Sequence, residues 1–248
     1  MCGRYVSTAS PEKIADYFGA MAGPDTTASP LPANFNVAPT TDVYGVVATA
    51  DGVRHVEVFK WGLVPNWAKD VKIGSKMINA RSETIGEKAA YKGVFRKHRC
   101  LIPMDGFYEW QAGQEGGPVT AKGAPAKQPM FIHRVDGEPL AVAGLWSSWR
   151  SRDAGDDEPW LHSCTIVTTA ANSTMAPVHD RMPVILPAWA WDEWLDPAND
   201  DTEALARLLV PAPDTLLTMH KVSTAVNSVR NKGEELIAPL DDEVGEQA

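Results

Sequence analysis

Cys2 has the most distinctive chemistry in this chain, because it directly follows the initiator methionine. Removal of Met1, which a small second residue permits, would leave an α-amine and a thiol on adjacent carbons. Such a pair condenses with an aldehyde, first as a Schiff base and then as a five-membered thiazolidine. The reference pKa of an α-amine is about 7.7–8.0, so part of the amine is nucleophilic near neutral pH. An inert, buried cysteine is the competing interpretation.

Two titratable residues could move protons for such a reaction. Glu109 lies between Tyr108 and Trp110, and a carboxyl group in an apolar pocket can act as general acid or base near neutral pH. His179 lies in a proline-flanked loop two residues before Arg181, where it could shuttle protons. The competing interpretations are a solvent-facing glutamate on an alternating strand and a structural or capping histidine.

Several arginines and tryptophans could bind nucleic acid. Arginine side chains bind phosphates through paired hydrogen bonds, although they also pair with acidic side chains. Tryptophan rings stack on bases, although most tryptophans belong to a protein core. The candidates are Arg4, Arg81, Arg181, Trp61, Trp67 and Trp110.

The charge of the chain is unevenly distributed. The net charge of -9 argues by itself against a nucleic-acid partner. Residues 54–99, however, contain 11 basic and four acidic residues, a net of +7, which leaves -16 on the remainder. A basic segment inside an acidic protein indicates one localised anion-binding face, or else a solvated face whose charges are balanced by neighbours.

Several classes of protein and site are disfavoured. There is no apolar run of about 20 residues and no signal-peptide pattern, so we expect a cytoplasmic protein without a membrane partner. The three cysteines Cys2, Cys100 and Cys164 form no C-x-x-C pair, which supports neither a metal site nor a disulfide framework. Phosphate-binding glycine motifs are also missing from the sequence, so no cofactor is expected.

Strand-like runs predominate over helical ones, without a regular strand–helix alternation. Turn signals at Asp51-Gly52 and Asp136-Gly137 predict two hairpins, between 43–49 and 53–60 and between 129–135 and 139–146. We expect further strands at 99–103, 106–111, 161–169 and 215–222, and helices after Ser10-Pro11 and at 84–97, 188–195 and 201–209.

This pattern predicts a single α+β domain with a mixed or antiparallel, barrel-like β-sheet core and flanking helices. No shift in composition divides the chain, so we expect the domain to span residues 1–240. Residues 112–127 are rich in glycine, lysine and proline and predict a mobile loop. Residues 241–248 form an acidic tail that we expect to fray.

Five short segments combine turn-forming, aromatic and charged residues in a way that packing does not require, and with three others they form an ordered set of eight. They are Met1-Cys2-Gly3-Arg4-Tyr5, Asn36-Val37-Ala38-Pro39, Trp61-Gly62-Leu63-Val64-Pro65, Asn79-Ala80-Arg81-Ser82-Glu83, Arg99-Cys100-Leu101-Ile102-Pro103, Asp105-Gly106-Phe107-Tyr108-Glu109-Trp110, Ala143-Gly144-Leu145-Trp146 and His179-Asp180-Arg181-Met182-Pro183. In this order they resemble the SRAP (SOS response-associated peptidase) family, over nearly the whole chain to about residue 240.

The resemblance implies covalent sensing of abasic sites in single-stranded DNA, which shields the site during the response to DNA damage. On the family pattern, Cys2 supplies both amine and thiol to the ring-opened sugar aldehyde. Glu109 acts as general acid and base, His179 assists proton transfer, and Asn79 positions Cys2 and the sugar.

The resemblance also implies which residues bind the DNA. Arginines would hold the flanking phosphates, while Pro39 and Trp67 would wedge or stack at a junction of single and double strand. The full DNA-binding set is Arg4, Pro39, Trp67, Arg81, Trp110 and Arg181. A monomer, associated with the nucleoid when bound to DNA, is expected to bind more weakly as salt rises.

Two other functions remain open on the sequence. Cys2 could be the N-terminal nucleophile of an amidohydrolase or thiol protease, with Glu109 and His179 as its base system. Alternatively, the protein could bind single-stranded DNA without a covalent bond. The sequence also leaves open whether Met1 is removed by the protein itself, in a peptidase-like step, or by a housekeeping aminopeptidase.

Overall fold

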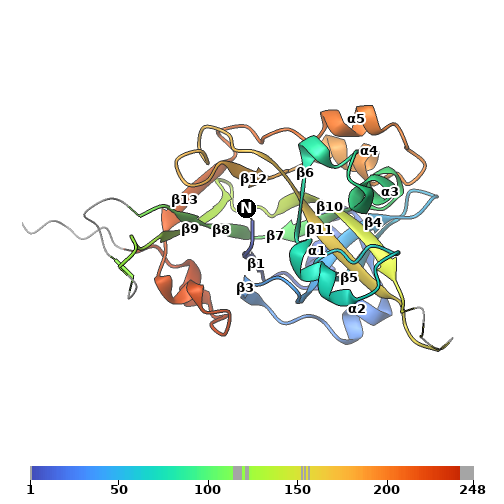
Figure 1. Cartoon of the computed structure of the whole chain (residues 1–248), viewed down its shortest axis with the longest axis horizontal. Coiled ribbons are helices and arrows are strands. Elements are labelled where there is room, and N and C mark those ends of the chain that lie inside the picture. Colours follow the sequence, from blue (N-terminus) through green and yellow to red (C-terminus); the bar gives the residue numbers. More distant parts are fainter. Residues whose placement is uncertain are drawn as a thin grey trace, which may run out of the picture.

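Five strands close into a small barrel, which lies to the right of the N-terminus in Figure 1. This computed structural model describes residues 2–113, 119–120, 123–151, 153, 155 and 157–240. Antiparallel pairs connect the barrel strands in the order β11-β10-β7-β4-β5, and a parallel pair from β5 back to β11 closes the ring. The strands are β4 (Asp42–Ala48), β5 (Arg54–Trp61), β7 (Arg99–Met104), β10 (Leu140–Trp149) and β11 (Leu161–Ala170).

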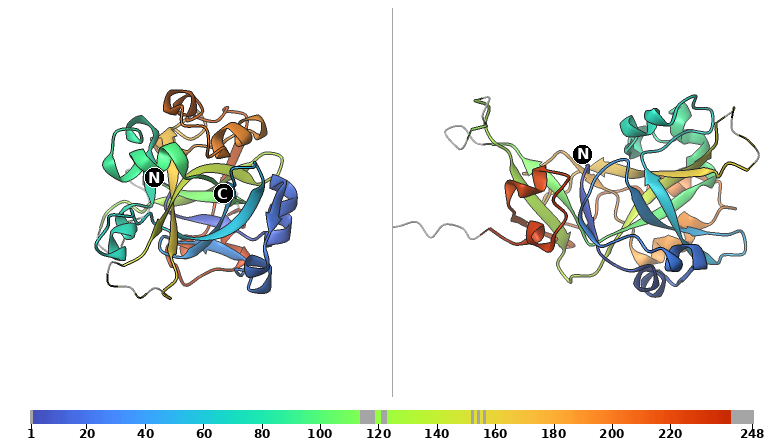
Figure 2. Two further views of the ribbon diagram at one scale, coloured as in Figure 1. Left: turned by 90° about the vertical axis from the view of Figure 1, so that its right-hand side faces the viewer. Right: turned by 90° about the horizontal axis from the view of Figure 1, so that it is seen from below.

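A second sheet extends to one side of the barrel (Figure 2). Its order is β13-β9-β8-β1-β3, with every pair antiparallel. The chain passes from the barrel into this sheet at Asp105, whose carboxylate accepts hydrogen bonds of 2.7 Å from both the backbone N–H and the hydroxyl of Thr8. The strands are β1 (Tyr5–Ser7), β3 (Asn34–Val37), β8 (Gly106–Gln111), β9 (Gln128–Arg134) and β13 (Leu217–Lys221).

Short strands and helices surround the barrel. β2 (Ala20–Ala22) runs parallel to β5, β6 (Asn79–Arg81) runs parallel to β11, and β12 (Arg181–Pro183) runs antiparallel to β11. The α-helices are α1 (Pro11–Phe18), α2 (Pro24–Ala28), α3 (Ala89–Lys97), α4 (Trp191–Leu195) and α5 (Thr202–Arg207). The 3-10 helices are η1 (Val71–Lys76), η2 (Ser82–Thr84), η3 (Ala188–Ala190), η4 (Thr224–Asn227) and η5 (Glu234–Ile237).

The two faces of the barrel strands form two different cores. One face packs against α1, α3, α4 and α5 through large side chains such as Phe18, Phe95 and Trp194. The opposite face points into the barrel, where a Cβ added at Gly45 would lie 2.9 Å from the ring of Phe59 and one added at Gly144 would lie 2.8 Å from Cys100 Sγ. The barrel interior is therefore filled by packed side chains.

The structure confirms the predicted α+β class with a barrel-like sheet, and it corrects one predicted hairpin. The turn at Asp51-Gly52 joins β4 to β5 as expected, with Gly52 at φ 81°. The turn at Asp136-Gly137 also forms, but β9 pairs with β8 and β13 in the second sheet, while β10 pairs with β7 and β11 in the barrel. Two adjacent strands on a tight turn thus belong to different sheets.

Two expected segments lie partly or wholly outside the residues that the structure describes. Part of the expected loop at 112–127 and the whole acidic tail at 241–248 lie outside them. The helix expected at 84–97 is shorter than predicted, because η2 ends at Thr84 and α3 begins only at Ala89. None of the described helices has the length and apolarity that crossing a membrane requires.

Candidate functional site at the N-terminal cysteine

Cys2 is wholly buried three residues before β1, within the apolar cluster that includes the inward-facing side chains of the barrel. Figure 1 places the N-terminus near the middle of the molecule, between the barrel and the second sheet. Burial raises the pKa of the Cys2 thiol far above its ordinary value, and the negative charge of Glu109 raises it further. The thiol is therefore protonated in the resting protein, and ionising it requires a base.

Glu109 is buried beside this thiol, with 3% of its surface exposed. β8 pairs with β1 so that Phe107 faces Tyr5 and Gly106 faces Val6, and the same register brings Glu109 level with Gly3. The negative charge of Glu109 is near enough to raise the pKa of the Cys2 thiol. The interpretation of Glu109 as a solvent-facing strand residue is thus wrong.

Asn79 contacts the cysteine from the opposite side. Its amide Nδ2 donates a hydrogen bond of 2.8 Å to the carbonyl oxygen of Cys2. β6 holds it there by pairing with β11, with Asn79 opposite Ile166, and the Tyr91 hydroxyl of α3 donates to its backbone carbonyl at 3.2 Å. Asn79 Oδ1 is buried and accepts no hydrogen bond from the described residues, so it is a free acceptor next to Cys2.

His179 lies in the turn that precedes β12, and this turn packs through Met175 and Val178 against the same apolar cluster as Cys2. His179 Nδ1 accepts a hydrogen bond of 2.9 Å from the backbone N–H of Arg181 and also lies 2.8 Å from Asp180 Oδ1. A neutral ring with a lone pair on Nδ1 satisfies the first contact, whereas a protonated ring satisfies the second. Both protonation states therefore have a partner.

Arg181 is engaged in an internal ion pair. Its guanidinium donates to both carboxylate oxygens of Glu83, at 2.5 and 3.0 Å, and to the backbone carbonyl of Thr168 at 2.7 Å. The hydrogen bond from Arg181 lowers the pKa of Glu83 against the opposing effect of partial burial. The pair joins η2 to β12, and so connects the segments that carry Asn79 and His179.

Arg4 is half-buried and is held by two acceptors. Its Nη1 donates to Asn36 Oδ1 at 2.7 Å and to the carbonyl of Val226 at 2.9 Å. The guanidinium carbon lies 5.7 Å from the ring centroid of Trp110, whose indole N–H donates to Asn227 Oδ1 at 2.7 Å. Burial lowers the pKa of Arg4, although the group remains a cation at neutral pH.

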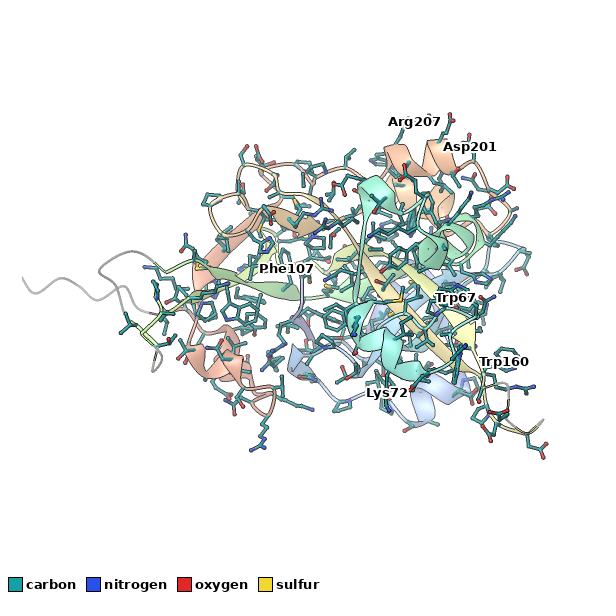
Figure 3. The ribbon with its side chains drawn as sticks, in the orientation of Figure 1. Trp67, Lys72, Phe107, Trp160, Asp201 and Arg207 are labelled. Carbon is teal, nitrogen blue, oxygen red and sulfur yellow. The ribbon has the colours of Figure 1, made fainter. Side chains whose placement is uncertain are left out.

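The remaining candidates are spread more widely. Arg81 is exposed at the end of β6, and Pro39 is partly buried in the turn before Thr40, which has a φ of 69°. Trp67 is 51% exposed and lies well to one side of Phe107 of β8 in Figure 3. Trp61 is a core residue, wholly buried, with its ring edge-on to Tyr5 at 5.2 Å. The structure thus brings Cys2, Asn79 and Glu109 together and leaves Trp67 apart.

Residue-by-residue reasoning missed two residues of this site. Glu83 lies within one of the eight segments, yet a lone glutamate gives no sign that it binds Arg181. Asn36 also lies within one of the eight segments, but no strand was predicted there, and nothing in the sequence marks it as a buried asparagine with 1% of its surface exposed. Among the described residues, no group of three or more His, Cys, Asp or Glu side chains could hold a metal ion.

Comparisons with known proteins agree on one family. Abasic site processing protein YoqW of Bacillus subtilis (strain 168) is 37% identical over 238 residues, which are 96% of this chain and 99% of that protein. Abasic site processing protein YedK of Escherichia coli (strain K12) is 32% identical over 247 residues, 97% of this chain and 100% of that protein.

Solved structures are similar over nearly the full length. A crystal structure of a Bacteroides thetaiotaomicron protein has a TM-score of 0.79 at 25% identity, and covers 96% of this chain and 100% of its own. A phage-related protein of Bordetella bronchiseptica has a TM-score of 0.63 at 31% identity, covering 89% and 94%. The family model described as SOS response associated peptidase (SRAP) matches residues 1–229. The chain therefore belongs to the SRAP family.

Proposed function

We propose that this protein processes abasic sites in DNA by forming a covalent bond through Cys2. The observation that carries the proposal is the arrangement of three residues: a buried Cys2 thiol, a buried Glu109 beside it, and Asn79 on the Cys2 carbonyl. The relatives YoqW and YedK are named as abasic site processing proteins, which supports abasic sites as the substrate. An abasic site in its ring-opened form is an aldehyde, the group with which a terminal aminothiol reacts.

The proposed reaction needs no cofactor. Once Met1 is removed, the α-amine of Cys2 attacks the sugar aldehyde, and the resulting carbinolamine loses one water to form a C=N bond. The thiol then adds across this bond, so that sulfur bonds to the carbon and the proton goes to the nitrogen. One water is released in total and no electrons are transferred.

Glu109 is the proton carrier in this scheme. The raised pKa of the Cys2 thiol means that sulfur attack requires a base, and the neighbouring carboxylate can take the proton. The same group, once protonated, can return a proton to the departing water. His179 assists from the turn before β12, where Asp180 can stabilise its protonated ring. Asn79 orients Cys2 through its carbonyl, and its free Oδ1 can accept from the amine or a sugar hydroxyl.

The proposed partner is single-stranded DNA that carries an abasic site, including junctions with double strand, bound by a monomer of which residues 1–240 form the functional unit. Arg81 is exposed and can contact a phosphate directly. Arg181 can do so only by exchanging Glu83 for the phosphate, since both oxygens of Glu83 bind it in the free protein. Trp67 can stack on a base at the side of the barrel, and Pro39 can support a junction.

Intact mass spectrometry tests the proposal directly. The protein would be measured alone and after mixing with a single-stranded oligonucleotide that contains one abasic site. We expect loss of Met1, and an adduct whose mass is that of protein plus oligonucleotide minus one water. Cys2→Ser should form no such stable adduct, whereas Cys164→Ser, a change at a buried cysteine of the barrel, should form it normally.

The other outcomes point to the competing functions. A processed terminus without an adduct would refute covalent trapping and favour an N-terminal-nucleophile hydrolase that uses Cys2 and Glu109. A retained Met1 would mean that the aminothiol never forms, which leaves only non-covalent DNA binding. If Met1 is lost from the wild type but retained in Glu109→Gln, the protein itself carries out its removal.

A further inference from the structure

The segment from Ser223 to Ile237, here called the strap, plays no part in the proposed chemistry. It contains η4 and η5 and lies beside the second sheet, in red in Figures 1 and 2. Val226 and Leu236 are wholly buried in a cluster that includes Val6 of β1 and Tyr108 of β8. Buried apolar side chains therefore anchor the strap before and after its central part, residues 227–232.

Asn36 of β3 fixes the backbone of that central part. Its Nδ2 donates to the carbonyls of Val226, Ser228 and Asn231, at 3.2, 3.0 and 2.9 Å. The backbone N–H of Phe35 donates to the carbonyl of Lys232 at 3.2 Å. A buried amide with three carbonyl acceptors holds these residues in one conformation, although every side chain from Asn227 to Lys232 is exposed.

Two cations project from this fixed, exposed stretch. Arg230 and Lys232 occur with no acidic residue between Asn227 and Lys232, and the nearest acids in the sequence are Glu234 and Glu235 in η5. Asp42, which lines the same hollow as Lys232, pairs with Lys60 at 2.7 Å. Among the residues that the structure describes, neither cation takes part in an ion pair, in contrast to Arg181 with Glu83. Both charges are therefore available to an external anion.

The strap directly contacts residues that the sequence predicts to bind DNA. The carbonyl of Val226 accepts from Arg4, and Asn227 accepts from the indole of Trp110. Lys232 also lines a hollow of about 180 Å³ together with Thr41 and Asp42, which continue the turn that contains Pro39. The strap thus runs along the edge of the proposed site, from Trp110 to the turn at Pro39.

We propose that the strap is a second DNA-binding element, in which Arg230 and Lys232 bind phosphates of the strand that flanks the abasic site. This inference rests on the proposed function and extends it to a basic surface outside residues 54–99. A strap that is already fixed by Asn36 loses little conformational entropy when it binds a phosphate, which favours the contact.

Salt-dependent binding measures this contribution without the covalent step. In a Cys2→Ser background, the affinity for an undamaged single-stranded oligonucleotide would be measured at salt concentrations from about 0.05 to about 0.3 M. Each phosphate contact contributes about 0.7 to the slope of log K against log salt for single strands, so Arg230→Ala with Lys232→Ala should reduce the slope by about 1.4. Referred to binding at about 1 M salt, the same relation predicts that the double variant binds about 25-fold more weakly than the parent at about 0.1 M salt.

A double variant with the same change in net charge is the matched control. Lys13→Ala with Arg207→Ala removes two exposed cations from α1 and α5, and Figure 3 labels Arg207 far from the strap. The control should leave the slope within about 0.3 of the parent value, because neither cation belongs to the strap. Equal slopes in the two double variants would overturn the inference. If the parent itself fails to bind the oligonucleotide, the proposed DNA function fails as well, so the two failures can be told apart.

Discussion

Glu109 acts on the Cys2 thiol at close range, because both side chains are removed from water. The thiol is kept neutral by burial and by the charge of Glu109, so it is protected from adventitious ionisation until a proton acceptor is used. An exposed cysteine terminus would be a stronger nucleophile on average, but it would react with any aldehyde. On the proposed function, the buried arrangement restricts reaction to a substrate that reaches both residues.

Replacing the carboxyl group while keeping its shape tests the role of this residue. Glu109→Gln should slow adduct formation by about 10²- to 10⁴-fold, the range expected for loss of a general acid–base group. Binding of undamaged single-stranded DNA should be unchanged. The measurement is the initial rate of adduct formation by gel or mass spectrometry, with the exposed Glu57→Gln as control. A rate within threefold of wild type would exclude Glu109 as the proton carrier.

At the scale of elements, η1 is held against the loop after β5 by two glycines. Gly62 has a φ of 130°, and a Cβ on Gly74 would lie 2.5 Å from the Gly62 carbonyl oxygen. Gly74→Ala should therefore destabilise the protein by about 1–3 kcal/mol, the usual cost of overpacking. Gly93→Ala, within α3, is the matched control, because the added Cβ would meet open space. It should stabilise the protein by about 0.5–1 kcal/mol. The free energies of unfolding of both variants would be measured by urea denaturation, and equal changes in the two would contradict this prediction.

The strap offers a second prediction at the same scale. Asn36→Ala removes three hydrogen bonds to strap carbonyls and the acceptor for Arg4, at a cost of about 2–4 kcal/mol at roughly 1 kcal/mol for each bond. Hydrogen exchange should accelerate within residues 223–237 more than in the barrel strands. Asn66→Ala, at an exposed asparagine whose side chain makes no hydrogen bond to the described residues, should show neither effect. Uniform acceleration across the whole chain would argue against a locally fixed strap.

At the scale of the whole molecule, burial of all three cysteines predicts alkaline destabilisation. Their pKa values are raised in the folded state, so their contribution to stability is complete below a pH of about 8.5, the thiol reference, and is lost as pH rises. Each thiol should then reduce the free energy of unfolding by about 1.4 kcal/mol per pH unit. Denaturation midpoints between about pH 7.5 and 10.5 measure this slope. Cys100→Ser should reduce it by roughly a third, and an unchanged slope would refute this explanation.

The sequence predicted the class of fold well, because strand alternation and turn residues are local signals. It also identified Cys2, Asn79 and Glu109, which the structure brings into one place. It could not predict that β9 and β10 belong to different sheets, since strand pairing depends on contacts far apart in the chain. For the same reason the pairing of Arg181 with Glu83, 98 residues away, was not readable from either residue alone.

The burial of Cys2 has a practical consequence for anyone who produces or labels this protein. A fusion partner attached ahead of Met1 would have to pass out of a core in which Cys2 is wholly buried and its carbonyl is hydrogen-bonded to Asn79. It would also convert the terminal amine to an unreactive amide. On the proposed function, such a chain lacks the reactive pair. Affinity tags therefore belong at the C-terminal end, and the codon that follows the start codon becomes part of the proposed chemistry.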